Sequence, residues 1–258
     1  MWFKVKSFIL FLLKSTNQHG VHSPFVYNLV TNCFYKKTPI SKIKLINKIK
    51  KWLFNNHEII SINDFGSGSK IFKGNQRKVS DITKIAGIST KKSLLLIRMI
   101  EYLELQNILE IGTSVGLGTA TLSIGNSKAT IKTLEGCKNT AAIAQKLFDT
   151  FNLENIQLSI GNFSNTLPSV IKNNQFDLIY FDGNHQKDAT LNYFELCLKT
   201  VHNNSVFIFD DINWSVEMQK AWLKIKNHPK VTVTIDTYFW GIVFFRKEQE
   251  KEHFTIRV

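Results

Sequence analysis

Two hydrophobic periods alternate along the chain from about residue 108 onward. Short apolar runs, typical of buried strands, alternate with longer segments in which apolar residues recur at helical spacing. The expected strands are 108–111, 130–134, 156–160, 176–181 and 205–209. The expected helices are 119–125, 139–151, 165–172, 187–200 and 215–227. Strands joined through helices imply right-handed crossovers and a parallel sheet.

Two further apolar runs, 231–235 and 239–245, follow the last helix with no helical segment between them. Their closeness predicts an antiparallel hairpin at the edge of the sheet. Five βα units followed by such a hairpin predict an α/β protein with a Rossmann-like, seven-stranded and mostly parallel sheet.

The residues before the first strand carry helical patterns. The first 20 or so place Phe3, Phe8, Phe11 and Leu12 near one helical face, which favours packing against the main domain and leaves contact with a membrane surface open. Further helices are expected at 24–34, 40–54, 80–86 and 90–105. We therefore expect two parts: a helical extension over 1–88, acting as a substrate lid or interaction region, and a main domain over 89–258.

Charge is unevenly distributed between these parts. The chain has 33 Lys and Arg against 20 Asp and Glu, and the first hundred residues hold 18 of the former and 3 of the latter. A basic half suggests nucleic acid, an anionic membrane or an acidic partner. However, 29 of the basic residues are Lys, as an AT-rich genome would favour, and base and phosphate recognition relies on Arg. A nucleic-acid partner is therefore not favoured.

Cysteine usage and hydropathy indicate the compartment. Cys33, Cys137 and Cys197 are scattered and odd in number, which favours a reducing environment over a disulfide framework. The apolar run 8–13 is too short for a secretory signal, and no run reaches the roughly 18 residues that a membrane span needs. We expect a cytoplasmic protein, with peripheral membrane contact through residues 1–14 left open.

A glycine-rich turn follows the first expected strand. Glu110 is followed by Gly112, Gly116 and Gly118, and a helical pattern begins directly afterwards. The spacing differs from the dinucleotide fingerprint G-x-G-x-x-G and lacks the Gly-Lys-Ser/Thr ending of a P-loop. Gly66 and Gly68 form a competing turn, but a basic loop follows them instead of an apolar helix, so we rank it lower.

The turn resembles the first motif, E/D-x-G-x-x-x-G, of class I S-adenosylmethionine (SAM) methyltransferases. This resemblance implies that residues 89–258 form a SAM-binding domain. It also implies that backbone N–H groups at the strand end meet the methionine part of SAM. The residues assigned to this part of the cofactor are Glu110, Gly112, Thr113, Ser114 and Gly116.

The ends of the next two strands supply further candidates for the cofactor. Glu135 stands 23 residues after Gly112, where a carboxylate can accept hydrogen bonds from both ribose hydroxyls. Its alternative interpretation is a solvated acid at a strand end. Gly161 and Asn162 end the third strand, and we expect the Asn162 amide to contact the edge of the adenine.

Three carboxylates follow the fourth and fifth strands. Asp182, Asp210 and Asp211 are expected to converge at adjacent strand ends, where their charges would repel one another. A hard divalent cation such as Mg²⁺ would relieve that repulsion and could hold a substrate oxygen. Alternatively, Asp182 and Asp211 cap the helices that follow them.

Residues 90–245 resemble the cation-dependent catechol and caffeoyl-CoA type O-methyltransferases. That resemblance implies metal ligation by Asp182, Asp210 and Asp211, and a role in cofactor binding for Asp182. The family has Asn where this chain has Asp211, and a catalytic Lys where it has His185. A histidine can still act as a general base on an acceptor hydroxyl, with Asp182 beside it.

Nearly the full chain also resembles a group of uncharacterised Bacteroidetes methyltransferase-like proteins, which implies a fold but no substrate. The segments that carry this resemblance are 19–25, 181–186, 210–212, 239–245 and 251–254.

The favoured hypothesis is SAM-dependent O-methylation of a small-molecule hydroxyl, with His185 and Asp182 as catalytic residues. RNA or protein methylation is an alternative that the basic N-terminal half motivates. The chain does not contain the sequence motifs for methylation of amino groups or of pyrimidine carbon 5, so the motifs do not support this alternative. A third hypothesis is a non-catalytic, membrane-associated SAM-binding module. A homodimer is left open in each case.

Overall fold

The computed structural model describes residues 2–63 and 74–258, so the competing turn at Gly66 lies outside the described residues. Two compact units make up the chain, Lys36–Val170 in one and Met1–Tyr35 with Ile171–Val258 in the other. The expected division near residue 88 stays a prediction.

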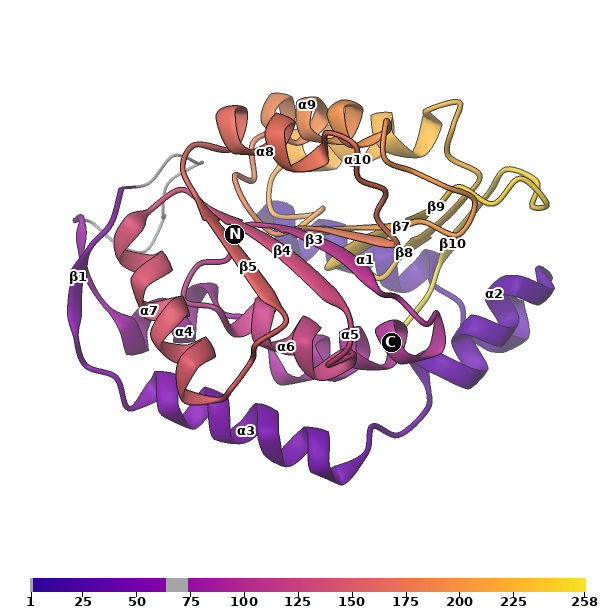
Figure 1. Cartoon of the computed structure of the whole chain (residues 1–258). Helices are drawn as coiled ribbons and strands as arrows, with labels where there is room; N and C mark the ends of the chain where they lie inside the picture. Colours follow the sequence, from indigo (N-terminus) through magenta and orange to yellow (C-terminus); the bar gives the residue numbers. More distant parts are fainter. Residues whose placement is uncertain (1, 64–73) are drawn as a thin grey trace. The chain divides into compact units, whose positions relative to one another are not determined.

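A mostly parallel sheet of eight strands runs through the described chain in the order β10-β8-β9-β7-β6-β3-β4-β5 (Figure 1). Its strands are β3 (Asn107–Ile111), β4 (Thr130–Glu135), β5 (Ile156–Ile160), β6 (Leu178–Phe181), β7 (Val206–Asp210), β8 (Val233–Asp236), β9 (Trp240–Phe244) and β10 (Glu252–Thr255). This arrangement confirms the predicted Rossmann-like α/β class. All seven expected strands are present, each within two residues of the predicted bounds.

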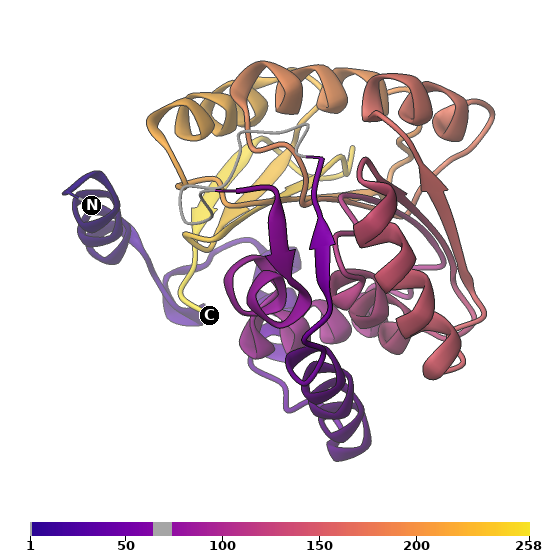
Figure 2. The same ribbon diagram turned by 90° about the vertical axis from the view of Figure 1, so that its left-hand side faces the viewer.

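The unit Lys36–Val170 contains the parallel ladder β3-β4-β5, with Glu110 opposite Thr133 and Thr133 opposite Leu158. Its helices are α3 (Ile40–Phe54), α4 (Val79–Ala86), α5 (Thr90–Tyr102), α6 (Leu117–Gly125), α7 (Lys138–Thr150) and α8 (Phe163–Ile171). A separate antiparallel hairpin joins β1 (Ile59–Ser61) to β2 (Gln76–Lys78), apart from the main ladder (Figure 2). Fully buried side chains on α5, β3 and β4 form the core of this unit.

The second unit carries the ladder β10-β8-β9-β7-β6. As predicted, β8 and β9 form an antiparallel pair, and β9 is also antiparallel to β7, with Asp210 opposite Trp240. Its helices are α1 (Trp2–Lys14), α2 (Pro24–Leu29) with the π-helical turn Val30–Phe34, α9 (Lys187–Cys197) and α10 (Val216–Asn227). The Ser23 hydroxyl accepts from the backbone N–H of Val26 and Pro24 opens α2, which explains why this helix begins where the sequence indicated.

The eighth strand, β10, was not predicted. It pairs in parallel with β8, with Phe254 opposite Ile235. The N-terminal segment joins this edge of the sheet, because Thr16 N–H donates to the Thr255 carbonyl (2.9 Å) and Arg257 N–H donates to the Thr16 carbonyl (3.1 Å). A tail that reads as charged in isolation therefore becomes a strand through pairing with distant residues.

Within the described ranges, no helix combines the length and the apolar composition that crossing a membrane requires.

Candidate functional site

The backbone after β3 forms a tight turn over residues 112–118, called here the glycine turn. Gly112 has φ of +110°, and its N–H and that of Thr113 both donate to the Leu134 carbonyl (3.0 and 3.1 Å). Gly116 has φ of +88° and stands directly before α6. A Cβ there would lie 2.9 Å from the Phe148 ring, so both conformation and space require glycine.

Glu110 lies fully buried at the end of β3, beneath the glycine turn. The hydroxyls of Thr119 and Thr133 donate to its Oε2, the latter at 2.6 Å, and the hydroxyls of Thr113 and Thr133 lie 2.6 Å apart. Its Oε1 has no hydrogen-bond partner among the residues that the structure describes. Burial raises the pKa of Glu110 to about 7, against the lowering effect of the two donated hydrogen bonds. The Glu110 carboxyl therefore connects β3 to β4 and α6 beneath the turn, through its hydrogen bonds with Thr133 and Thr119.

Glu135 connects the end of β4 to the glycine turn. The N–H of Ser114 donates to its Oε2 (2.6 Å) and the N–H of Cys137 to its Oε1 (2.9 Å). Burial raises the pKa of Glu135, and these backbone hydrogen bonds oppose that rise. Hydrogen bonds with the Thr140 side chain and the Gly136 backbone also lower the pKa of this carboxyl. The side chain is half-buried and held by the backbone, unlike a solvated acid at a strand end.

Gly161 and Asn162 follow β5. Gly161 N–H donates to the Glu135 carbonyl (2.8 Å), which continues the ladder by one residue. Asn162 is exposed, and its Oδ1 accepts from the N–H and the hydroxyl of Ser164 (3.0 Å each) at the start of α8. The side-chain oxygen of Asn162 therefore caps a helix, which leaves the amide nitrogen as the group for the predicted adenine contact.

A second set of candidates lies in the other unit, at the carboxyl ends of β6 and β7. We call Asp182, His185, Asp210 and Asp211 the acidic edge. His185 Nε2 lies 3.9 Å from Asp182 Oδ1, and both side chains are about one-fifth exposed. Between them, Asn184 has φ of +52° and its Nδ2 donates to the Tyr193 hydroxyl (3.2 Å).

Asp210 and Asp211 differ in their surroundings. Asp210 is buried, with the Tyr180 hydroxyl donating to its Oδ2 (3.4 Å) and the Asp211 N–H donating to its Oδ1 (2.8 Å). Asp211 is half-buried and has φ of +55°. Both oxygens of the Asp210 carboxylate thus accept hydrogen bonds from residues of the same unit.

The helix-capping alternative for these acids is wrong. The structure begins α9 after Gln186 and α10 after Ser215, whose hydroxyl accepts from the Met218 N–H (3.1 Å). Asp182 and Asp211 therefore stand too early in the chain to cap either helix.

No group of three or more His, Cys, Asp or Glu side chains is clustered so as to hold a metal ion within 2–63 and 74–258. The metal role of Asp182, Asp210 and Asp211 stays a prediction.

The sequence did not predict which residues form hydrogen bonds with or beside these acids. Those residues are Thr119, Thr133, Cys137, Tyr180, Asn184 and Tyr193. One signal was available for Thr133, because a glutamate inside an apolar strand needs a polar partner opposite it, and Thr133 stands opposite Glu110.

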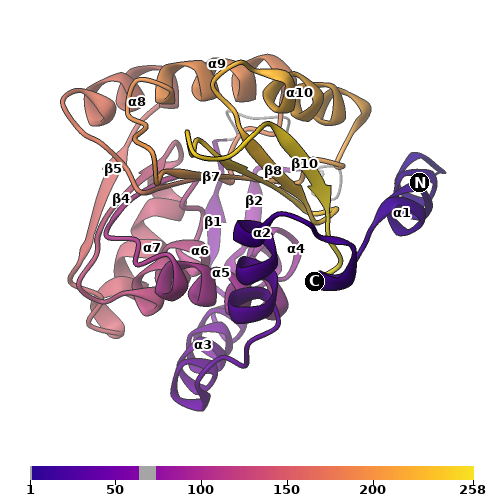
Figure 3. The same ribbon diagram turned by 90° about the vertical axis from the view of Figure 1, so that its right-hand side faces the viewer.

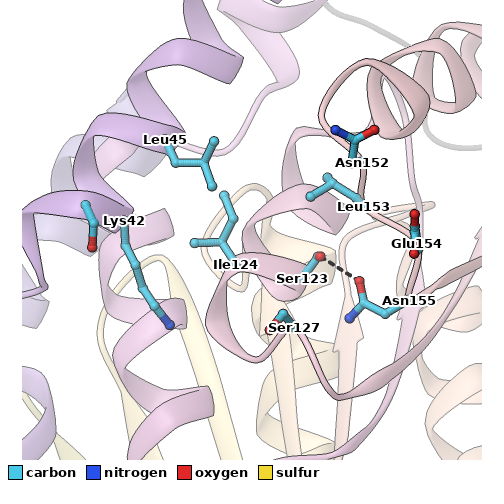
Figure 4. A pocket seen from close by; sticks show the side chains of 10 residues that line it. Lys42, Leu45, Ser123, Ile124, Ser127, Asn152, Leu153, Glu154 and Asn155 are labelled. Atoms are coloured by element: carbon cyan, nitrogen blue, oxygen red, sulfur yellow. Dashed lines mark hydrogen bonds between the residues drawn. The ribbon is translucent and has the colours of Figure 1, made fainter.

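A groove of about 570 Å³ lies elsewhere in the unit Lys36–Val170 (Figure 4). Lys42 and Leu45 of α3 line one side, and the end of α6 with the segment 152–155 lines the other. Ser123 donates to Asn155 Oδ1 there (2.7 Å). Because α6 leads away from the glycine turn and Asn155 precedes β5, the groove lies at the opposite ends of the strands from Glu135.

Comparisons with known proteins agree with this fold. A family model described as a methyltransferase domain matches residues 109–212, from β3 through the end of β7. No curated protein matches the chain by sequence.

Several solved structures share the architecture. The SAH-bound methyltransferase PaMTH1 from Podospora anserina is 16% identical, with 88% of this chain and 97% of that chain covered and a TM-score of 0.62. An O-methyltransferase from Bacillus cereus in complex with SAH is 20% identical, with 84% and 96% covered and a TM-score of 0.55. The SAM complex of the O-methyltransferase TomG from Streptomyces achromogenes, involved in tomaymycin synthesis, is 17% identical, with 62% and 82% covered and a TM-score of 0.56.

The chain therefore has the fold of SAM-dependent O-methyltransferases, as the glycine spacing and the strand count predicted.

Proposed function

We propose that this protein is a SAM-dependent methyltransferase acting on the hydroxyl group of a small molecule. The observation that carries the proposal is the glycine turn held against Glu135, with the Ser114 N–H donating to that carboxylate at 2.6 Å. Solved proteins of the same fold are bound to SAM or SAH, which supports the same cofactor here.

The residues of the unit Lys36–Val170 fit the nucleoside part of this cofactor. Glu135 accepts hydrogen bonds from the ribose hydroxyls, while the N–H groups of Ser114 and Cys137 hold its carboxylate in place. The backbone of the glycine turn approaches the ligand closely at Gly112, which has no side chain. Bound SAM supplies a methyl group on a positively charged sulfur, which an oxygen nucleophile can attack.

His185 takes the proton of the acceptor hydroxyl at one ring nitrogen. The Asp182 carboxylate, 3.9 Å from His185 Nε2, stabilises the positive charge that forms on the ring. The chain's own contribution to the rate is then positioning and proton removal.

Calorimetric titration with SAH tests the cofactor assignment. We expect wild-type protein to bind SAH, and Glu135→Ala to weaken binding by about 10- to 100-fold, because it removes charge-assisted hydrogen bonds to two hydroxyls. Glu154→Ala is the matched control, since Glu154 is an exposed acid of the same unit that lines the separate groove. Wild-type protein that does not bind SAH would overturn the proposal.

A further inference from the structure

In the ribbon diagram of Figure 3, the N-terminal helix α1 stands out from the rest of its own unit. The ring centroids of Phe8 and Phe11 lie 4.9 and 5.6 Å from that of Tyr238, which joins β8 to β9. The Tyr238 hydroxyl donates to the Lys4 carbonyl (2.9 Å), and Lys4 Nζ lies 3.5 Å from the centre of the Trp214 ring. These contacts fix the helix in place and define its inner face.

The opposite face of α1 is open and mostly apolar, with the exposed Lys6 standing one turn from Trp2. Trp2 is 79% exposed, Ile9 51% and Leu13 78%. Their spacing of seven and four residues places them along one side of the helix, away from Phe8 and Phe11. Three more exposed apolar side chains broaden that side, namely Val5, Leu10 and Leu12. Scattered exposed apolar residues are ordinary, whereas a contiguous apolar helical face marks a surface that binds something.

The charge of the helix indicates which partner fits. α1 carries Lys4, Lys6 and Lys14 and no acidic residue, and the first acid in the whole chain is Glu58. Two copies of α1 packed together would bring like charges into contact, and the net charge of +13 adds repulsion between whole molecules. Anionic lipid headgroups attract the same charges, while the acyl region accepts the apolar side chains.

We propose that α1 is an interfacial membrane helix that binds the surface of an anionic bilayer. Trp2, Ile9 and Leu13 enter the boundary between headgroups and acyl chains. Lys6 and Lys14, both exposed, lie at the level of the lipid phosphates. With 13 residues, the helix lies along the surface and does not span the bilayer.

Within its unit, α1 rests beside the acidic edge. Asn213 Nδ2 donates to the Tyr238 carbonyl (2.8 Å), and the Trp214 N–H donates to the Asp211 carbonyl (2.8 Å). The two residues that support α1 are therefore tied to the loop that begins at Asp211. A membrane-bound α1 holds that loop at the lipid surface. This binding does not depend on the proposed methyl transfer.

Vesicle flotation tests the proposal on the full chain. Wild-type protein is expected to float with vesicles of phosphatidylcholine mixed with phosphatidylserine, and to float weakly with phosphatidylcholine alone. The double variant Trp2→Ser/Leu13→Ser is expected to lose about tenfold or more in partitioning, because two large side chains no longer leave water. Leu223→Ser is the matched control, since Leu223 is 58% exposed on α10 of the same unit.

The electrostatic part has its own variants. Lys6→Gln and Lys14→Gln are each expected to weaken binding about fivefold on the anionic vesicles. Lys199→Gln, at an exposed lysine after α9, is the control and should change binding less. SAH titration of all these variants should match wild type, so a failure of membrane binding is distinguishable from a failure of the proposed function.

Three outcomes would overturn the proposal. The first is wild-type protein that fails to float with anionic vesicles, and the second is a Trp2→Ser/Leu13→Ser variant that floats as well as wild type. The third is a dimer, detected in solution by light scattering and abolished in this double variant, which would assign the apolar face to a second copy of the chain.

Discussion

The glycine turn and the acidic edge are both placed at strand ends, yet they differ in how firmly their side chains are held. Around the glycine turn, Glu110 and Glu135 accept hydrogen bonds of 2.6 to 2.9 Å from the Thr133 hydroxyl and from the N–H groups of Ser114 and Cys137. At the acidic edge, the Asp211 N–H donates to Asp210 at 2.8 Å, whereas the His185–Asp182 and Tyr180–Asp210 distances are 3.9 and 3.4 Å. The closer side-chain contacts around the glycine turn support the proposal that this region binds the cofactor.

Positive φ occurs in both regions. At the glycine turn it falls on Gly112 and Gly116, where it costs little, and on Ser114 (+51°). At the acidic edge it falls on Asn184 (+52°) and Asp211 (+55°), non-glycine residues that tolerate this conformation better than most. Positive φ at non-glycine residues is frequent at functional sites, which supports the proposal that His185 and Asp182 carry the chemistry.

The largest expected effect is on catalysis at the acidic edge. His185→Gln should lower the rate of SAH release with a catechol acceptor by about 10²- to 10⁴-fold, because it removes a general base. SAH binding should remain as in wild type, because the glycine turn and Glu135 lie in the other unit.

The control for this variant is His202→Gln. His202 also pairs with an aspartate, Asp177, at the closer distance of 3.0 Å, but this pair lies before β6 and β7 and not at their carboxyl ends. Its loss should leave the rate unchanged. Equal rate losses in both variants would contradict the assignment of His185.

The next effect is on folding at the glycine turn. Gly116→Ala should lower the free energy of unfolding by about 2–4 kcal/mol, because it combines a left-handed backbone with a Cβ 2.9 Å from Phe148. Urea unfolding measures the change. Gly74→Ala is the control, since a Cβ at Gly74 meets nothing within 4 Å, and it should change stability by less than about 1 kcal/mol.

The third effect is a pH dependence of stability from Glu110. Its pKa in the folded protein, about 7, lies above the ordinary value of 4.5, so the folded state retains a proton that the unfolded chain has lost. Stability is therefore greatest below pH 4.5 and falls as the pH rises through 7, by up to about 3 kcal/mol. Glu135, whose pKa is also raised, acts in the same direction.

Unfolding curves at several pH values test the contribution of Glu110. Glu110→Gln should remove most of the slope between pH 4.5 and 7, whereas Glu154→Gln, at an exposed acid, should leave it as in wild type. A variant Glu110→Gln that keeps the full slope would show that another group titrates in this range.

Local patterns in the sequence located the elements that depend on neighbouring residues. The apolar run before Gly112, the Ser-Pro pair at 23–24 and the helical spacing over 40–54 each describe a structure that forms from adjacent residues. These elements appear within one or two residues of the expected bounds, because turn chemistry and capping act over a few positions.

Features that depend on distant pairing were missed. The strand β10 forms only because β8 lies beside it, and its sequence alone is charged and short. Similarly, the hydrogen bond from Thr133 to Glu110 depends on the register of β3 against β4. The prediction that Asp182 and Asp211 cap helices was wrong for a related reason. No local motif indicated how many loop residues separate each aspartate from the helix that follows.

The smallest expected effect distinguishes two roles of Asn162, capping of α8 and contact with the adenine. Its Oδ1 caps α8 through Ser164, and only its amide nitrogen remains for adenine. Asn162→Asp keeps a capping oxygen and loses the amide donor, so unfolding free energy should change by less than about 0.5 kcal/mol while SAH affinity falls about fivefold. Asn162→Ala should also lose about 1 kcal/mol of stability with the cap. If Asn162→Asp binds SAH as wild type does, the residue serves α8 alone, and the proposed cofactor site ends at Glu135 and Gly161.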